Sequence, residues 1–200
     1  MEKRILDKKT LRKMALMAAD AYMEDPVHKN CTKVRIFRRR FLYHFMTERF
    51  SSSNGVDYIY LDEKERGMCI WRDAKNDYTA LDFLKCPHWV FLVLYWISTI
   101  RTLIIYSRRD LTVFPDNTLL IEPVFVGRDF HGKGIATELI KQGIAELLPL
   151  GFNLGLETQN PDNISLYEKL GFRVISKQTL KKGSIYNYSM LYVGENAEQN

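Results

Sequence analysis

Cysteine is scarce in this 200-residue sequence. Its three cysteines, Cys31, Cys69 and Cys86, are too few and too widely spaced for a disulfide framework or a CxxC metal site. Because disulfides are rare where thiols are kept reduced, we expect a protein of a reducing, cytoplasmic compartment. Residues 1–10 are charged and lack the apolar segment of a signal peptide, which agrees with that expectation.

Long hydrophobic runs are also missing. The most apolar stretch, residues 89–106, is apolar or nearly so until Arg101 interrupts it. A membrane-spanning helix needs about 20 consecutive apolar residues. We therefore expect a helix that is buried or that covers a bound ligand. A helix lying on a membrane surface is the alternative.

Several familiar site patterns are absent. His28, His44 and His88 show no spacing typical of metal ligands, so we expect no metal. The sequence has no G-x-x-x-x-G-K-[S/T] run, and no G-x-G-x-x-G with an acidic residue about 20 positions further on. These absences argue against a triphosphate-binding loop and a dinucleotide-binding fold. Ser165 lacks the G-x-S-x-G setting of a serine hydrolase.

The composition that remains is globular. Hydrophobic residues make up 46% and charged residues 26%, which excludes a disordered chain and a collagen. At about 150 residues per domain the length predicts one domain, which we place at residues 1–193, followed by a polar tail at 194–200. The 29 basic and 24 acidic residues leave a net charge of +5, which mildly favours an anionic partner. Nucleic acid, an anionic membrane and a phosphorylated cofactor all satisfy that preference.

Hydrophobic periodicity predicts the secondary structure. Helical spacing indicates helices over residues 11–24, 33–50, 81–106, 132–148 and 161–170. Strands are predicted over residues 56–61, 67–72, 118–126, 152–157, 172–177 and 184–193. The first two strands form an antiparallel hairpin, and residues 51–55 form a turn. This order of helices and strands is typical of one mixed α/β domain.

The second predicted helix carries a cluster of basic residues. Its buried face is expected to hold Val34, Phe37, Phe41 and Phe45. Its polar face holds the three arginines at positions 38–40, which we interpret as solvated. Binding to nucleic acid or to a membrane is the alternative for this cluster.

A glycine-containing turn follows the most apolar strand. Strand 118–126 ends, a loop turns, and a helix starts at Gly132 and Gly134. Glycine lets the backbone approach a ligand closely, and the unpaired N–H groups of a first helical turn attract an anion. A phosphate or pyrophosphate therefore fits here, although an ordinary strand–helix turn has the same appearance.

A second segment makes the first one specific. Residues 131–136 follow Q/R-x-x-G-x-G/A, and about 30 residues later Asn163, Tyr167, Lys169, Gly171 and Phe172 follow a pattern with an asparagine upstream of L/Y-Y-x-K-x-G-F. Together these motifs resemble the GNAT superfamily of acetyl-CoA-dependent N-acetyltransferases. The resemblance covers about residues 119–172, with a looser similarity at residues 21–26. One position departs from the pattern: His131 stands where Gln or Arg is usual, and it would make a phosphate contact dependent on pH.

The resemblance implies a fold and a cofactor. The fold is a mixed α/β (α+β) single domain with a central, mostly antiparallel, splayed sheet of six to seven strands flanked by helices. The pantetheine arm of acetyl-CoA lies where strands 118–126 and 152–157 part, and the N–H groups of the glycine turn hold the pyrophosphate. Arg128 and Lys169 are further candidates for phosphate contacts. The implied cofactor-binding residues are Val124, Phe125, Val126, His131, Gly132, Lys133, Gly134, Ile135, Ala136, Thr137, Asn160 and Asn163.

Two residues are implied as catalytic. Glu122 shares a strand face with Val124 and Val126, and a carboxylate in so apolar a strand is expected to have a raised pKa, which suits a general base. The alternative is that Glu122 faces solvent or pairs with a structural cation. Tyr167 matches the tyrosine that protonates the cofactor sulfur, and the alternative is packing against the core. Pro123 is expected to mark a bulge beside the site.

The first two helices and the loop between them line the acceptor site in this family. The resemblance therefore makes Tyr22, Glu24, Asp25 and Phe37 acceptor contacts, and the two carboxylates suit a cationic amine. The expected function is transfer of the acetyl group to a small-molecule amine by direct attack in a ternary complex, in a monomer or homodimer without nucleic-acid or membrane partners. The alternatives are acetylation of a protein N-terminus or lysine, and a catalytically weak module that binds acyl-CoA as a regulatory ligand.

Overall fold

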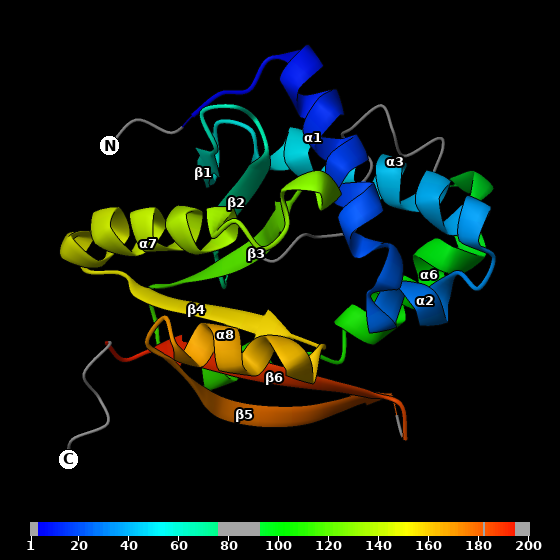
Figure 1. Cartoon of the computed structure of the whole chain (residues 1–200). Coiled ribbons are helices and arrows are strands. Elements are labelled where there is room, and N and C mark those ends of the chain that lie inside the picture. The colour runs from blue at the N-terminus through cyan, green and yellow to red at the C-terminus, as the bar shows by residue number, and fades with distance from the viewer. Residues whose placement is uncertain (1–3, 76–92, 182, 195–200) are drawn as a thin grey trace.

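The protein is built on one twisted sheet with helices on both faces (Figure 1). The computed structural model describes residues 4–75, 93–181 and 183–194. Its strands lie in the order β1-β2-β3-β4-β6-β5, and only the β3–β4 pair is parallel. This confirms the expected mixed α/β fold. The strands are β1 (Tyr58–Leu61), β2 (Gly67–Asp73), β3 (Thr118–Val126), β4 (Asn153–Thr158), β5 (Phe172–Lys181) and β6 (Ile185–Tyr192).

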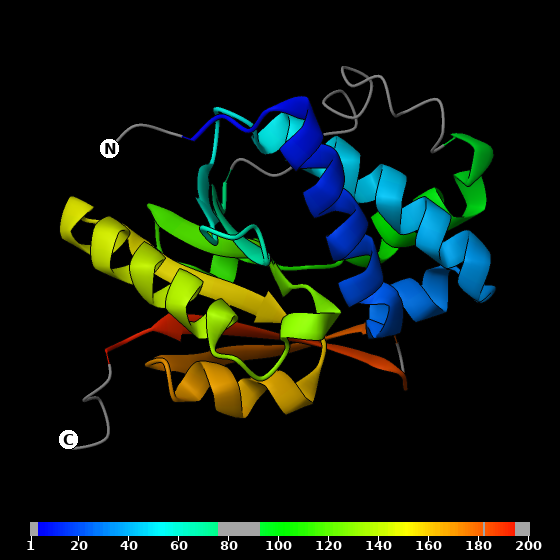
Figure 2. The same cartoon turned by 45° about the horizontal axis from the view of Figure 1, so that its top comes forward.

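The described helices divide between the two faces of the sheet (Figures 1 and 2). Along β2, Met68 and Ile70 pack into a core with α1 and α3, whereas Cys69 and Trp71 pack into a second core with α7. Burial on both faces explains why β2 and the first half of β3 are apolar nearly throughout. The helices are α1 (Lys8–Ala21), α2 (Pro26–Cys31), α3 (Arg35–Ser53), α6 (Trp96–Tyr106), α7 (Ile135–Leu147) and α8 (Ile164–Glu168). The 3-10 turns are η1 (Tyr22–Glu24), η2 (Leu111–Val113), η3 (Arg128–Phe130), η4 (Leu148–Leu150) and η5 (Pro161–Asn163).

Two details of the N-terminal helices differ from the sequence expectation. Pro26 does not simply end the first helix, because it opens the short helix α2, which the periodicity missed. Oδ1 of Asp25 accepts the N–H groups of Val27 and His28 and caps that helix. Of the turn predicted at residues 51–55, the first three residues are still helical, and two serine hydroxyls there donate back to carbonyls about one turn earlier.

The faces of α3 are also not those expected. Phe41 and Phe45 are buried as predicted, but Val34 and Phe37 are about half exposed, Phe37 at 50%. Arg38 was expected in solvent and is only 6% exposed, because its guanidinium donates to the carbonyl of Thr32 at 3.2 Å. The basic cluster is therefore not one solvated face.

The helix expected over residues 81–106 is described only from residue 93. In α6 the buried side chains are mainly Ser98, Thr99 and Thr102, whereas Trp96 is 59% exposed and Ile100 is also exposed. The expectation of a buried apolar helix is therefore wrong for this described part, and the expectations for Cys86, His88 and the rest of 81–92 lie outside the described residues. None of the described helices has the length and hydropathy to cross a membrane.

The parallel ladder between β3 and β4 is short, and its end positions the site. Four residue pairs join the strands, from Thr118↔Asn153 to Ile121↔Leu156, and then the strands part. On the other side of β3 the register with β2 shifts between Cys69 and Trp71, which places an extra residue on β3 at Glu122–Pro123, where the peptide bond is cis. The expected bulge is therefore present. Beyond Glu122, β3 keeps its pairing with β2 but has none with β4.

Candidate active site

A cleft of about 600 Å³ opens where β3 and β4 separate. The end of β3 lines one wall of this cleft, and the end of β4 with the following turn η5 lines the other. An unpaired strand edge can accept one more extended segment as if it were a strand, so the geometry fits the pantetheine arm. Six of the residues implied to bind cofactor line this cleft: Val124, Phe125, Val126, His131, Asn160 and Asn163.

The start of α7 has the geometry of an anion site. Gly132 and Gly134 have φ of +73° and +76°, a region that L side chains rarely adopt. Gly134 is the N-cap of α7 and no side chain caps the helix, so its first N–H groups are available to a ligand. This uncapped terminus fits a pyrophosphate. The side chain of Ile135 is buried in the core, so only its backbone can serve the site.

The cationic side chains near this turn take different directions. Nε2 of His131 lies 3.0 Å from the carbonyl oxygen of Val126, so the imidazole closes the loop on itself. Nζ of Lys133 lies 5.2 Å from the centroid of the Phe130 ring, and Lys169 is exposed at the end of α8. Arg128 lines a separate hollow with Asp20 and is not among the residues that line the cleft. This position does not support the expected contact between Arg128 and a phosphate.

A smaller cavity of about 100 Å³ continues inward from the cleft. Aromatic side chains from five elements form part of its wall, including His28, Phe45 and Tyr106. Burial lowers the pKa of His28, and Nδ1 of that ring has no hydrogen-bond partner among the described residues. The residues that line both the cleft and the cavity mark their junction: Tyr22, Asp25, Val124, Glu157, Gln159 and Tyr167.

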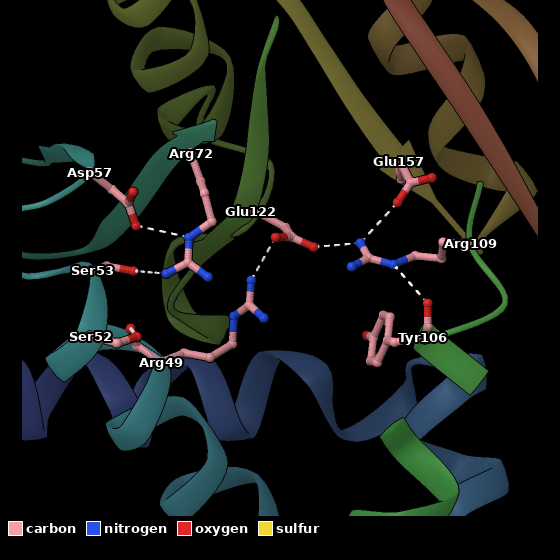
Figure 3. A network of polar contacts seen from close by, with 9 residues as sticks. All are labelled: Arg49, Ser52, Ser53, Asp57, Arg72, Tyr106, Arg109, Glu122 and Glu157. Carbon is pink, nitrogen blue, oxygen red and sulfur yellow. Dashed lines mark hydrogen bonds and ion pairs between the residues drawn. The ribbon is translucent and has the colours of Figure 1, made fainter. Parts of the chain in front are cut away.

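A chain of alternating charges forms the floor of the inner cavity (Figure 3). Arg49 of α3 donates to Oε2 of Glu122 at 2.7 Å, and Arg109, which follows α6, donates to Oε1 of Glu122 at 2.6 Å. The same Nη1 of Arg109 donates to Oε2 of Glu157 at 2.9 Å. Glu122 and Glu157 come directly after the last β3–β4 pair, so Arg109 joins the two strands where they part.

The environment of Glu122 is not the one expected from the sequence. Burial alone would raise the pKa of this carboxyl group, but the charges of Arg49 and Arg109 outweigh burial and hold the pKa well below its usual range. The expectation of a raised pKa is therefore wrong, because the apolar strand gave no sign of two arginines from distant segments. The geometry instead matches the alternative, in which Glu122 pairs with structural cations.

Glu157 responds differently to the same network. Its burial raises its pKa, and the attraction of the shared Arg109 only partly offsets this. The other donors to this carboxylate are neutral: Asn187 donates at 2.5 Å and Ser189 at 3.2 Å, both to Oε1. Two carboxylates that share one arginine therefore have pKa values displaced in opposite directions.

Tyr167 and Tyr22 both line the junction of the cleft and the inner cavity. Tyr167 of α8 is buried, and burial raises its pKa to about 12, so its phenol keeps its proton at neutral pH. The hydroxyl of Tyr22 donates to the carbonyl of Val124 at 3.0 Å, which ties the end of α1 to the open stretch of β3. Burial also raises the pKa of Tyr22.

The four expected acceptor contacts separate in space. Tyr22 and Asp25 lie at the junction of the two hollows. Glu24 lines only the outer cleft and forms an ion pair with Lys29 at 3.0 Å. Phe37 lines a groove beside α6 and neither of the two hollows, so the structure does not bring it together with the other three.

The residues that sequence analysis missed come from far along the chain. Arg49 lies 73 residues from Glu122, and Arg109 lies 48 residues from Glu157, so no spacing rule links them. Glu157 carried a usable signal, because it ends a strand that was expected to part from β3 at this position. Within the described ranges, no group of three or more His, Cys, Asp or Glu side chains is arranged to hold a metal ion.

Comparison with known proteins agrees with this geometry. The model of the Acetyltransferase (GNAT) family matches residues 56–172, more than half of the chain. The chain therefore belongs to the GNAT acetyltransferase family, whose members generally use acetyl-CoA. Comparison with curated proteins gave no match.

Solved structures support the same fold. The chain is similar to the histone acetyltransferase HPA2 and related acetyltransferase from Corynebacterium glutamicum, with a TM-score of 0.63, 14% identity, and coverage of 97% of this chain and 98% of that one. It is also similar to PH1933 from Pyrococcus horikoshii, with a TM-score of 0.55, 17% identity, and coverage of 97% and 96%. At these identities the likeness shows the fold alone.

Proposed function

We propose that this protein is an N-acetyltransferase that moves the acetyl group of acetyl-CoA to a primary amine of a small molecule, by direct attack in a ternary complex. The observation that supports this most is that the outer cleft and the inner cavity meet at one junction, where a phenol and carboxylates lie together. Two substrates bound in these hollows would meet at that junction, and positioning of this kind is a large part of catalysis.

Acetyl-CoA supplies a thioester, whose carbon–sulfur bond breaks as the amine nitrogen bonds to the acetyl carbon. In the proposal, the backbone of Val124 to Val126 holds the pantetheine arm and the N–H groups at the start of α7 hold the pyrophosphate. Tyr167 donates its phenolic proton to the departing sulfur, which its buried, protonated state favours, and the proton that the nitrogen loses as the amide forms restores the phenol. Glu122 stays ionised between two arginines and keeps Arg49 and Arg109 in place.

The proposed acceptor is a small cation. Asp25 lies at the junction, and its Oδ1 is held by the first N–H groups of α2, which fixes the carboxylate where an ammonium group would arrive. The inner cavity, at about 100 Å³, has room for an alkylamine end and little more. A protein N-terminus or lysine is the rival acceptor. We further propose a cytoplasmic location, which the free thiols of Cys31 and Cys69 support. A monomer or homodimer without nucleic-acid or membrane partners is also part of the proposal.

Calorimetric titration with acetyl-CoA tests the cofactor assignment. We expect micromolar binding by the wild type and no measurable binding by Gly134→Glu, because a side chain at φ +76° strains the turn and its carboxylate repels the pyrophosphate. Gly151→Glu is the matched control, since Gly151 has φ of +84° with open space around it but lies beyond the opposite end of α7. Equal binding by the wild type and Gly134→Glu would contradict the assignment.

A thiol-release assay over a panel of amines tests the reaction. The panel contains small monoamines, polyamines, amino acids and a peptide with a free N-terminus. Turnover of a small amine supports the proposal, and preferential turnover of the peptide favours the rival acceptor. Cofactor binding with no turnover of any amine would instead indicate a regulatory acyl-CoA-binding module.

A further inference from the structure

The two carboxylates at the end of the parallel ladder are not equivalent, although Arg109 holds both. Glu122 has a guanidinium on each oxygen, from Arg109 on Oε1 and from Arg49 on Oε2. Glu157 has one guanidinium on Oε2, and among the described residues only the neutral side chains of Asn187 and Ser189 donate to Oε1. A proton added to Glu122 must therefore be held between two cations, whereas a proton added to Glu157 meets one cation that a second carboxylate already neutralises.

Their positions relative to the two hollows differ as well. Glu122 lines the inner cavity alone, whereas Glu157 lines both the inner cavity and the outer cleft. Because the thioester would lie in the cleft and the amine in the cavity, a group that takes a proton from the attacking nitrogen must reach both. Glu157 meets this requirement, and Glu122 does not.

From this geometry we infer that Glu157, and not Glu122, accepts the proton of the acceptor ammonium, and that Arg109 is a positioning residue that fixes Glu157 and keeps Glu122 ionised. The inference rests on the proposed function. In the step, one N–H bond of the ammonium breaks, its electron pair becomes the lone pair on nitrogen, and an O–H bond forms at Oε2 of Glu157. The proton passes to solvent through the outer cleft after the products leave, which restores the carboxylate.

Burial and hydrogen bonds hold the side chain of Glu157 in a fixed position. It is only 5% exposed, compared with 23% for Glu122. Asn187, which donates to it, is completely buried, and its own carbonyl oxygen accepts a hydrogen bond from Gln159. The amide of Asn187 is thereby oriented with its N–H group toward Glu157.

The charges around Glu157 come from several elements and set the sign of its pH dependence. Arg109 lowers its pKa and Glu122 raises it, while burial raises it most. Arg49 faces it from α3 across Glu122, and the remaining titratable groups of the inner cavity are Tyr22, Asp25, His28, Tyr106 and Tyr167. If the charge of Glu122 is removed, Glu157 is the one carboxylate of this pair that still attracts Arg109, so the pKa of Glu157 must fall.

The first measurement reads protonation without turnover. In ligand-free protein labelled with ¹³C at the glutamate carboxyl carbon, the Glu157 signal is assigned by its loss in Glu157→Gln. We expect this signal to titrate above the ordinary range of glutamate, and to titrate at lower pH in Glu122→Gln. A midpoint at or below the ordinary value of about 4.3 would overturn the inference.

The second measurement is kcat/KM against pH for the wild type, Glu157→Gln, Glu157→Asp and Glu122→Gln, with the best amine of the panel. Glu157→Gln should lose activity by about 10²–10⁴-fold together with the acidic limb of the profile. Glu157→Asp should recover part of the rate, and Glu122→Gln should keep an acidic limb that has moved to lower pH. Retention of the rate and the acidic limb in Glu157→Gln would overturn the inference.

Calorimetry with acetyl-CoA distinguishes a failure of the inference about Glu157 from a failure of the proposed function. A Glu157→Gln protein that still binds acetyl-CoA as the wild type does is folded at the cleft, so its loss of rate reports on proton transfer. A wild type that acetylates no amine contradicts the proposed function itself, and the inference then falls with it. An active wild type with an unaffected Glu157→Gln variant contradicts the inference alone.

Discussion

The outer cleft with the start of α7 and the inner cavity, which we propose as the cofactor side and the acceptor side, are built by different means. On the cofactor side, the open edge of β3, the glycine turn and the start of α7 lie within about 20 consecutive residues, and most of what they offer is backbone. On the acceptor side, Arg49, Arg109, Glu122 and Glu157 arrive from four separate segments and meet through charged side chains. A backbone cradle tolerates change in many side chains. A buried charge network does not, because removal of one partner leaves another charge uncompensated.

The largest loss of activity is expected from a substitution at Tyr167, which lines both the cleft and the inner cavity. Tyr167→Phe removes the proton donor and retains the ring that packs near Phe172. We expect kcat to fall by about 10²–10⁴-fold, since general acid catalysis contributes about that much, with little change in the affinity for acetyl-CoA. Rapid-mixing kinetics and calorimetry measure the two quantities. A proportionate loss of cofactor affinity would mean that Tyr167 acts by packing alone.

A second variant asks whether the charges behind the acceptor side are structural. Arg72 of β2 and Asp57 form an ion pair at 2.9 Å, and both side chains are nearly buried. Figure 3 shows this pair beside the network of Glu122. Arg72→Met should lower the free energy of unfolding by about 3–5 kcal/mol, because Asp57 is left buried without its cation. Urea unfolding measures this change.

The matched control for that variant is Arg39→Met. The pair of Arg39 with Asp20 lies in solvent, where an ion pair contributes about 0–1 kcal/mol. Equal losses of stability in Arg72→Met and Arg39→Met would show that burial of the Asp57 pair adds nothing.

The smallest effect is expected at the entrance for the amine. Asp25→Asn removes a negative charge at the junction and keeps an oxygen that can cap α2, so the KM for the amine should rise by about tenfold, equivalent to roughly 1.4 kcal/mol. The affinity for acetyl-CoA should stay the same. Phe37→Ala is the control, because Phe37 lies in the groove beside α6 and its loss should leave the KM unchanged. An equal rise in KM for both variants would mean that the amine binds elsewhere.

Sequence reasoning was most successful where structure is local. The bounds of β3 and the glycine turn before α7 follow from apolar patterning and from residue types next to each other in the chain. It was least successful where a side chain meets a partner from another segment. Arg38 was expected in solvent because its neighbours are basic, but a carbonyl six residues away holds it inside. The apolar face of α6 was expected inside, and in the described part of the chain it is outside.

The sequence by itself determined the order of the strands, most of the helices around them and the family, since each depends on residues that are neighbours in the chain. Only the tertiary structure decided the electrostatics of the acceptor side. The pKa of Glu122 depends on Arg49 and Arg109, and that of Glu157 depends on its burial and on sharing Arg109. Coulomb energies depend on distance in space, and folding brings together charges whose separation in the sequence carries no information about that distance.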